Sequence, residues 1–190
     1  MNSFCVPLDI NCDPCIKNVI TDYGISADTQ TAMHVQVPLN DISMEFMDFL
    51  RSHNMDLLLA ELFFNPPRRV STIHVDALGG NYSKINFVYG GEKSLMCWYS
   101  VNDGVTSKEA VDYTSINTRS YNYKEDEVTL VHRQSLQSPS IVQVGVPHNI
   151  INAFKPRWCL SLVPVKLGTK QRITIEETIG LFKNSIVEEG

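Results

Sequence analysis

The chain has 190 residues, of which 43% are hydrophobic and 19% are charged, and it carries a formal charge of −5. These values suit one globular domain with a buried core and exclude a disordered chain. The acidic balance argues against nucleic acid as a partner, because phosphate binding needs clustered Lys and Arg. No stretch approaches the roughly 20 apolar residues of a membrane span, and the N-terminus lacks a secretory signal. The five cysteines, an odd number, fit a reducing compartment, so we expect a cytoplasmic protein.

The first third of the chain predicts a strand and a helix that support a later β core. Residues 32–38 alternate in polarity and end at a proline, which is typical of a short strand. The apolar residues of 42–50 fall at helical spacing, and Asn54 is a plausible end of that helix. Residues 55–64 are apolar and fit a helix or a strand equally well, and two prolines end this segment.

Beyond residue 68 the sequence reads as many short strands with turn residues between them. The expected strands are 69–76, 83–89, 94–101, 126–133, 139–146, 149–152 and 157–165. This pattern predicts a mainly β fold, a double-stranded β-helix (a jelly roll, cupin-like) with flanking α-helices. We expect one domain over 1–190, with its core at about 67–165, support from 1–66, and a C-terminal helix at 174–184 that begins with a capping box.

A long polar segment at 103–125 interrupts the strands and carries several tyrosines, among them Tyr113, and Arg119. Long loops in compact domains are usually functional or mobile. The segment is either part of a substrate-binding rim or lid, or a disordered excursion into solvent.

The strand at 69–76 carries His74 and Asp76, which the alternation of an extended chain places on one face. His148 lies far enough along the chain to return on a different strand, and opposite sheets of a jelly roll bring such strands face to face. Two imidazoles and one carboxylate are the ligand set of non-haem Fe(II) oxygenases. By the same alternation Arg157 and Ser161 share a face, and a guanidinium with a nearby hydroxyl is suited to gripping a carboxylate.

These residues resemble the 2-oxoglutarate and Fe(II)-dependent dioxygenases, in particular small stand-alone, prolyl-hydroxylase-like members. The resemblance covers about residues 67–165 and extends to the paired segments 85–91 and 96–99. Arg157 follows His148 by nine residues and Ser161 follows four later, whereas many members space the arginine ten or more residues away and the hydroxyl residue two further on.

The resemblance implies Fe(II) on His74, Asp76 and His148. It places the distal carboxylate of 2-oxoglutarate on Arg157, helped by Ser161, and it makes Asn86 and Tyr99 candidates for the other end of the cosubstrate. The implied reaction consumes O₂ and 2-oxoglutarate, releases succinate and CO₂, and hydroxylates a C–H bond. The substrate class it favours is an amino-acid side chain, free or peptidyl, or another small molecule.

Two alternatives stay open. A cupin-like jelly roll could bind a small ligand or a partner without turnover. A metal site could also use another metal or dispense with 2-oxoglutarate, in which case removing Arg157 would leave activity largely intact. The pair Cys12 and Cys15 has no second pair to complete a zinc site, so we take them as ordinary thiols.

Overall fold

The computed structural model describes residues 4–76, 80–106, 108–109, 120–136 and 139–187. These described residues form two six-stranded antiparallel sheets. The first sheet has the order β1 (Cys5–Pro7), β10 (Ser140–Gln143), β5 (Ser83–Gly90), β12 (Arg157–Lys166), β3 (Met55–Asn65) and β2 (Met33–Val37). The second has the order β7 (Lys108–Glu109), β8 (Tyr121–Tyr123), β4 (Ile73–Val75), β11 (His148–Ile151), β6 (Leu95–Val101) and β9 (Val128–Gln134).

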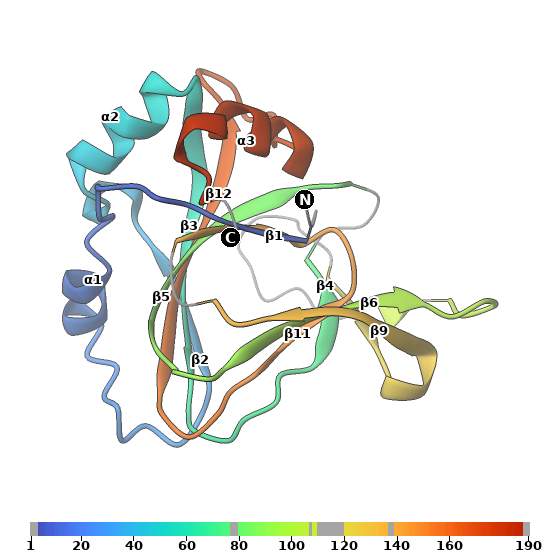
Figure 1. Cartoon of the computed structure of the whole chain (residues 1–190). Coiled ribbons are helices and arrows are strands. Elements are labelled where there is room, and N and C mark those ends of the chain that lie inside the picture. Colours follow the sequence, from blue (N-terminus) through green and yellow to red (C-terminus); the bar gives the residue numbers. More distant parts are fainter. Residues whose placement is uncertain (1–3, 77–79, 107, 110–119, 137–138, 188–190) are drawn as a thin grey trace.

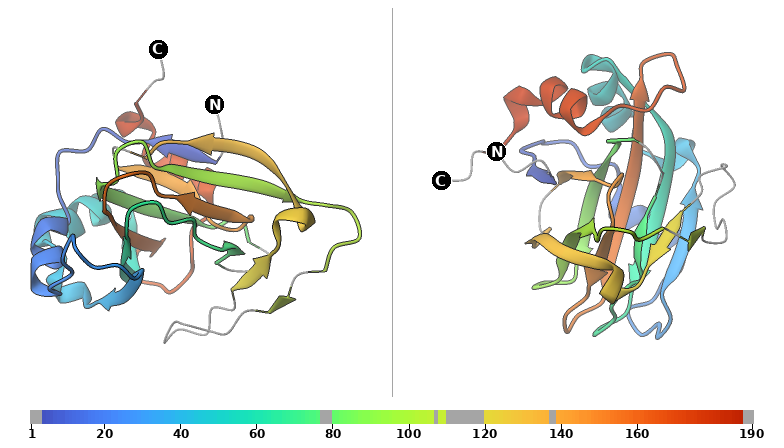
Figure 2. Two further views of the ribbon diagram at one scale, coloured as in Figure 1. Left: turned by 90° about the horizontal axis from the view of Figure 1, so that it is seen from below. Right: turned by 90° about the vertical axis from the view of Figure 1, so that its right-hand side faces the viewer.

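The chain passes repeatedly from one sheet to the other. From β3 onward β5, β10 and β12 return to the first sheet, while β4, β6, β9 and β11 build the second. The two sheets face each other (Figure 1 and Figure 2). This antiparallel two-sheet topology is a jelly roll, so the predicted fold class is confirmed.

The main hydrophobic core lies on the outer face of the first sheet, beneath the helices. The helices are α1 (Ile16–Asp22), α2 (Met44–Ser52) and α3 (Ile175–Leu181), and the 3-10 turns are Leu39–Asp41, Glu125–Glu127 and Lys183–Ser185. Outward-pointing Ile85 and Leu162 pack in this core with Phe46 of α2 and Ile175 of α3. Because side chains alternate along a strand, the intervening positions of β5 and β12 face the interior between the two sheets.

A second, smaller apolar cluster fills part of that interior. Met96 and Trp98 of β6 pack there with Val142 and Val144, and the Trp98 indole N–H donates to the Gln143 carbonyl at 2.9 Å. The rest of the inward-facing surface carries both polar and apolar side chains, and it contains the candidate site.

The strands predicted beyond residue 68 are present, and the sheets also begin earlier in the chain than expected. The ambiguous segment 55–64 is strand β3, which pairs with β12 along its whole length, so the β core starts before residue 67. Its apolar run suits both faces of a strand buried between neighbours. The predicted strand at 69–76 is shorter, because only Ile73–Val75 forms regular ladder pairs.

The two predicted helices are present, and each has a side-chain cap at its start. The helix predicted from residue 42 begins at Met44, where Ser43 accepts a hydrogen bond from the Phe46 N–H. Thr174 and Glu177 form the predicted capping box at the start of α3, with distances of 3.2 and 3.1 Å. The segment 103–125 contributes β7 and β8, but Tyr113 and Arg119 lie outside the described residues, and the expectation of a rim or lid stays a prediction. Within the part of the chain that is described, no helix is long and apolar enough to cross a membrane.

The connection between β11 and β12 is fastened by Asn152. Its amide N–H groups donate to the carbonyls of Asn65, Pro66 and Lys155 at 2.7–3.1 Å, and its carbonyl oxygen accepts from Ser94. This side chain therefore ties the β11–β12 connection to the end of β3 and to the turn before β6.

Candidate metal centre

The structure brings His74, Asp76 and His148 together inside the jelly roll. The expectation that His148 meets His74 from the opposite sheet is wrong, because β4 and β11 are neighbours in the second sheet and the two histidines are direct ladder partners. Directly opposite residues of an antiparallel pair project from the same face. Their ring centres are 4.6 Å apart. Asp76 follows His74 by two residues and completes the group, as the alternation predicted.

Both imidazoles are oriented by the backbone. Nδ1 of His74 lies 2.9 Å from the Thr72 carbonyl oxygen, and Nδ1 of His148 lies 2.9 Å from that of Val146. A carbonyl oxygen only accepts, so each Nδ1 carries a proton and donates it. In a neutral ring this leaves the Nε2 lone pair free, and both Nε2 atoms face Asp76. The same arrangement orients metal-binding histidines, whose second nitrogen donates to a carbonyl or carboxylate.

The three side chains can hold a metal ion. The Nε2 atom of His74 is 3.2 Å from Asp76 Oδ1, that of His148 is 3.9 Å from the same oxygen, and the ligand atoms all lie within 4.8 Å of one another. Two donor atoms that each lie about 2.1 Å from a metal ion, at right angles to one another, are roughly 3 Å apart. The three ligand atoms are therefore slightly farther apart here than they would be around a bound ion. Two imidazoles and a carboxylate on one side of the ion would leave the opposite side open to other ligands.

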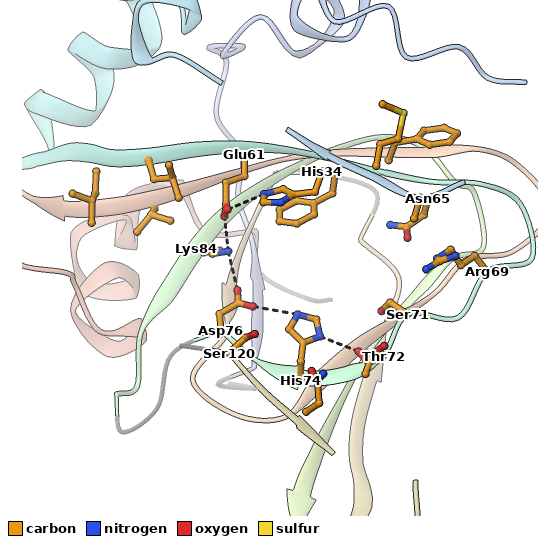
Figure 3. Close-up of a pocket in the computed structure, with 18 of the residues that line it drawn as sticks. His34, Glu61, Asn65, Arg69, Ser71, Thr72, His74, Asp76, Lys84 and Ser120 are labelled. Carbon is orange, nitrogen blue, oxygen red and sulfur yellow. Dashed lines mark hydrogen bonds and ion pairs between the residues drawn. The ribbon is translucent and has the colours of Figure 1, made fainter. Parts of the chain in front are cut away.

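Asp76 is held from its other oxygen by the buried Lys84 of β5. The Lys84 ammonium donates to Asp76 Oδ2 at 2.8 Å and to Glu61 Oε2 at 3.0 Å, and Glu61 Oε1 accepts from His34 at 2.9 Å. Figure 3 shows this chain of contacts from His34 to His74. Because Lys84 takes one carboxylate oxygen, Asp76 presents the other to the two histidines.

The electrostatics of the group keep Asp76 ionised. Burial raises the pKa of the Asp76 carboxyl, but the Lys84 charge and the His74 hydrogen bond outweigh it and hold that pKa well below its usual range. Burial likewise lowers the pKa of Lys84, yet its two carboxylate partners raise that pKa above its ordinary value. The interior therefore contains a compensated set of charges.

The two histidines differ in their proton affinity. Burial and the neighbouring His74 charge lower the pKa of His148 to about 4, so its ring is neutral at pH 7. Burial also lowers the pKa of His74, but the hydrogen bond and charge of Asp76 outweigh that and raise it. Without a metal, a proton on His74 Nε2 satisfies the short contact with Asp76, and a metal ion would replace that proton.

A cavity of about 580 Å³ opens beside this group, a size typical of small-molecule sites. Figure 3 shows His74 and Asp76 facing Glu61 and His34, with Lys84 between the two carboxylates and Ser71 and Thr72 beside His74. Asn65 and Arg69 line the far end, and apolar walls come from Leu58, Leu59, Phe63, Phe64 and Val163.

The predicted cosubstrate residues of β12 and β5 face the interior but do not line this cavity. Arg157 is 3% exposed, and its charge opposes the burial that raises the pKa of the Cys159 thiol. The Ser161 hydroxyl donates to the Asn86 side-chain oxygen at 2.7 Å, and the two residues are partners in the β12–β5 ladder. All three are buried, and none is among the residues that line the cavity.

Tyr99 is not brought to the metal group. On β6 it follows Trp98, the ladder partner of His148, so the alternation of the strand turns it to the opposite face. There its hydroxyl donates to Asn149 at 3.0 Å, and burial raises the pKa of the phenol to about 12. Tyr99 therefore supports the outer face of the second sheet.

Four charged residues of the cavity lining were not predicted as site residues from the sequence: Glu61, Arg69, Lys84 and Arg172. Glu61 is the one charged residue within the apolar run 57–64, which is the signal that could have marked it. Lys84 alternates with apolar residues at the start of β5, so its inward direction followed once that strand was assigned. Arg172 lies beyond β12, after the turn that follows it, and carries no sequence signal of a site.

Comparisons with known proteins do not identify a family. No family model matches the sequence, and no curated protein matches it. Among solved structures, peruvianin-I, a cysteine peptidase from Thevetia peruviana latex, is 16% identical over 88% of this chain and 96% of its own, with a TM-score of 0.37. Vicilin from Corylus avellana (hazelnut) is 12% identical over 84% of this chain and 41% of its own, with a TM-score of 0.35. Both similarities are too distant to bear on the function.

Proposed function

We propose that the protein is an Fe(II)- and 2-oxoglutarate-dependent dioxygenase that hydroxylates a C–H bond of an amino-acid side chain, free or peptidyl, or of another small molecule. The observation that carries the proposal is the His74, Asp76 and His148 group, with two backbone-oriented Nε2 atoms and one carboxylate oxygen facing one another inside a jelly roll. Bound iron and 2-oxoglutarate would supply the oxidation, with O₂ consumed and succinate and CO₂ released.

This chain's residues would position the metal and keep its ligands in one protonation state. The Thr72 and Val146 carbonyls hold the imidazole rings so that Nε2 faces the ion. Lys84 holds Asp76 to a single free oxygen, which leaves room for a cosubstrate and O₂ on the open side.

The charge of the cavity supports an anionic cosubstrate. Its lining includes two acids, Glu61 and Asp76, and three bases, Arg69, Lys84 and Arg172. With a divalent cation on the metal group and neutral histidines, these charges would leave a surplus positive charge of three. A dianion such as 2-oxoglutarate would offset most of that surplus in a partly desolvated site.

Arg157 is the resemblance's candidate for the distal carboxylate of the cosubstrate. Its support is burial on the inward face of β12. Its position outside the cavity lining favours the second candidate, a metal-binding jelly roll that binds a ligand without turning over 2-oxoglutarate. The two candidates differ in whether a keto acid chelates the bound iron.

The test is an anaerobic titration of purified protein with Fe(II) and then 2-oxoglutarate, followed by the weak visible absorption of the metal-to-keto-acid chelate. We expect the band in the wild type only after both additions, its loss in His74→Ala, and its retention in the control His53→Ala, at the end of α2. Iron binding without the band supports the second candidate, and failure to bind iron refutes both.

A further inference from the structure

Among the described residues, Arg172 is the one cation of the cavity with a buried side-chain nitrogen that has no hydrogen-bond partner. Its Nε atom is inaccessible to solvent and makes no hydrogen bond. Lys84, by contrast, pairs with two carboxylates, and Arg69 is exposed at the far end. A buried polar atom without a partner is costly, and in a native cavity it usually points to a missing ligand or water.

The surroundings hold Arg172 in place. Its guanidinium lies over the Tyr82 ring at 4.5 Å from the ring centre, and its backbone pairs with Val165 of β12. The turn that leads to it is closed by the Lys166 N–H donating to the Gln171 carbonyl at 2.9 Å. The cation is therefore pre-oriented by the stacked ring and the turn, which reduces the entropic cost of binding an anion.

The position relative to the metal group determines what Arg172 can bind. It lines the same cavity as His74 and Asp76, and it lies within electrostatic range of Asp76 and Glu61. Neither carboxylate forms an ion pair with it, because Lys84 and the histidines already occupy their oxygens. Its N–H groups therefore remain available to a ligand in the cavity.

We propose that Arg172 is the anion anchor of the cavity and binds a carboxylate of the ligand that lies beside the metal group. A guanidinium presents two parallel N–H donors that match a carboxylate. The cavity would then take carboxylic acids, and its apolar walls from Phe63, Leu59 and Val163 would contact the remainder of the molecule. The anion anchor itself does not depend on the proposed function. Only the source of the carboxylate rests on it, and that source is either 2-oxoglutarate or an acidic substrate.

The first arm of the test needs no iron. Metal-free protein is titrated with succinate, a compact dicarboxylate, and with its neutral diamide, succinamide, by thermal shift and calorimetry. We expect succinate to stabilise the wild type and succinamide to have no effect. Arg172→Met should weaken succinate binding by about 10- to 100-fold, the loss expected for a charge-assisted bidentate contact. The control Arg51→Met, on α2 and outside the cavity lining, should not.

Methionine keeps an apolar contact with Tyr82, and unchanged far-ultraviolet circular dichroism would show that the variant folds. Arg172→Lys should restore only part of the affinity, because an ammonium lacks the planar pair of donors. The proposal is overturned if Arg172→Met binds succinate as the wild type does, or if the wild type does not bind it.

The second arm assigns the source of the carboxylate, with anaerobic Fe(II)-loaded protein and 2-oxoglutarate. Weaker binding of 2-oxoglutarate in Arg172→Met, but not in Arg157→Met, assigns the carboxylate to the cosubstrate. Unchanged binding, together with a positive first arm, assigns it to an acidic substrate. If the wild type forms no keto-acid chelate but binds succinate through Arg172, the dioxygenase proposal fails while the anion anchor stands.

Discussion

Replacing Lys84 with methionine tests whether the charges inside the jelly roll are coupled as the contacts indicate. Lys84 is the shared partner of Asp76 and Glu61, at 2.8 and 3.0 Å, and it is 7% exposed. Methionine has a similar length and no charge, so packing changes little. Two buried carboxylates would then lose their common cation.

The magnitude follows from the protons that the variant must take up. With the cation that both carboxylates contact removed, we expect one carboxyl group to be neutral in the folded state at pH 7, although its ordinary pKa is near 4. Holding a proton about 3 pH units above the ordinary pKa costs roughly 4 kcal/mol, which agrees with the roughly 3–5 kcal/mol found when a buried ion pair loses one partner. At pH 5 the same proton costs only about 1 kcal/mol.

The assay is urea unfolding followed by the fluorescence of the two buried tryptophans, Trp98 and Trp158, at pH 5 and at pH 7. The variant's raised carboxyl pKa means that its folded state binds more protons than its unfolded state, so its stability falls as the pH rises. We expect Lys84→Met to lose about 3 kcal/mol more at pH 7 than at pH 5. Adding Glu61→Gln should recover most of that difference, and a loss independent of pH would refute the electrostatic account.

Three further predictions address other parts of the chain. Because the pKa of His148 is lowered to about 4, the unfolded chain binds a proton there between about pH 6.5 and 4 while the folded chain does not. Metal-free wild type should therefore lose roughly 3 kcal/mol of unfolding free energy as the pH falls through that window, and His148→Gln should not lose it. Urea unfolding against pH measures this, and parallel profiles for the two proteins would contradict it. Gly91→Ala should destabilise the fold by at least about 1–2 kcal/mol, because Gly91 has a φ of +65° and a Cβ there would lie 2.6 Å from Arg157 Cβ; a melting temperature equal to that of the wild type would argue against this. Thr174→Ala should cost about 1 kcal/mol by removing the cap bonded to Glu177. Unfolding of Glu177→Ala and of the double variant should show a combined loss smaller than the sum of the two single losses if the side chains act as a capping box.

The strands and the metal group could be predicted because their signals are local and periodic. The two-residue spacing of His74 and Asp76 fixes their common face in any strand, whatever the neighbours. The place of His148 was predicted less well, because it meets His74 on the neighbouring strand of the same sheet and not across the two sheets. The segment 55–64 could not be assigned in the same way, since a strand buried on both faces and a buried helix share the same continuous apolar pattern.

The cation at the cavity wall could not be predicted, because its position depends on tertiary contacts. Arg172 reaches the cavity only because the chain after β12 folds back on Tyr82. Nothing in the local sequence indicates that these two residues are in contact. Tyr99 shows the opposite limitation. Its strand was predicted, but which of two alternating faces meets His148 depends on the β6–β11 register, and a shift of one residue exchanges the two faces.

The side-chain amide of Asn152 fixes the length of the connection between β11 and β12. Surface connections usually tolerate insertions, but this one is held at three carbonyls from two different segments. An extra residue between β11 and β12 would break those bonds and leave a buried amide without partners, at a cost of about 1–3 kcal/mol. The interval from His148 to Arg157 is therefore set by an asparagine that touches neither, and homologous chains with a longer interval should have a different residue at this position.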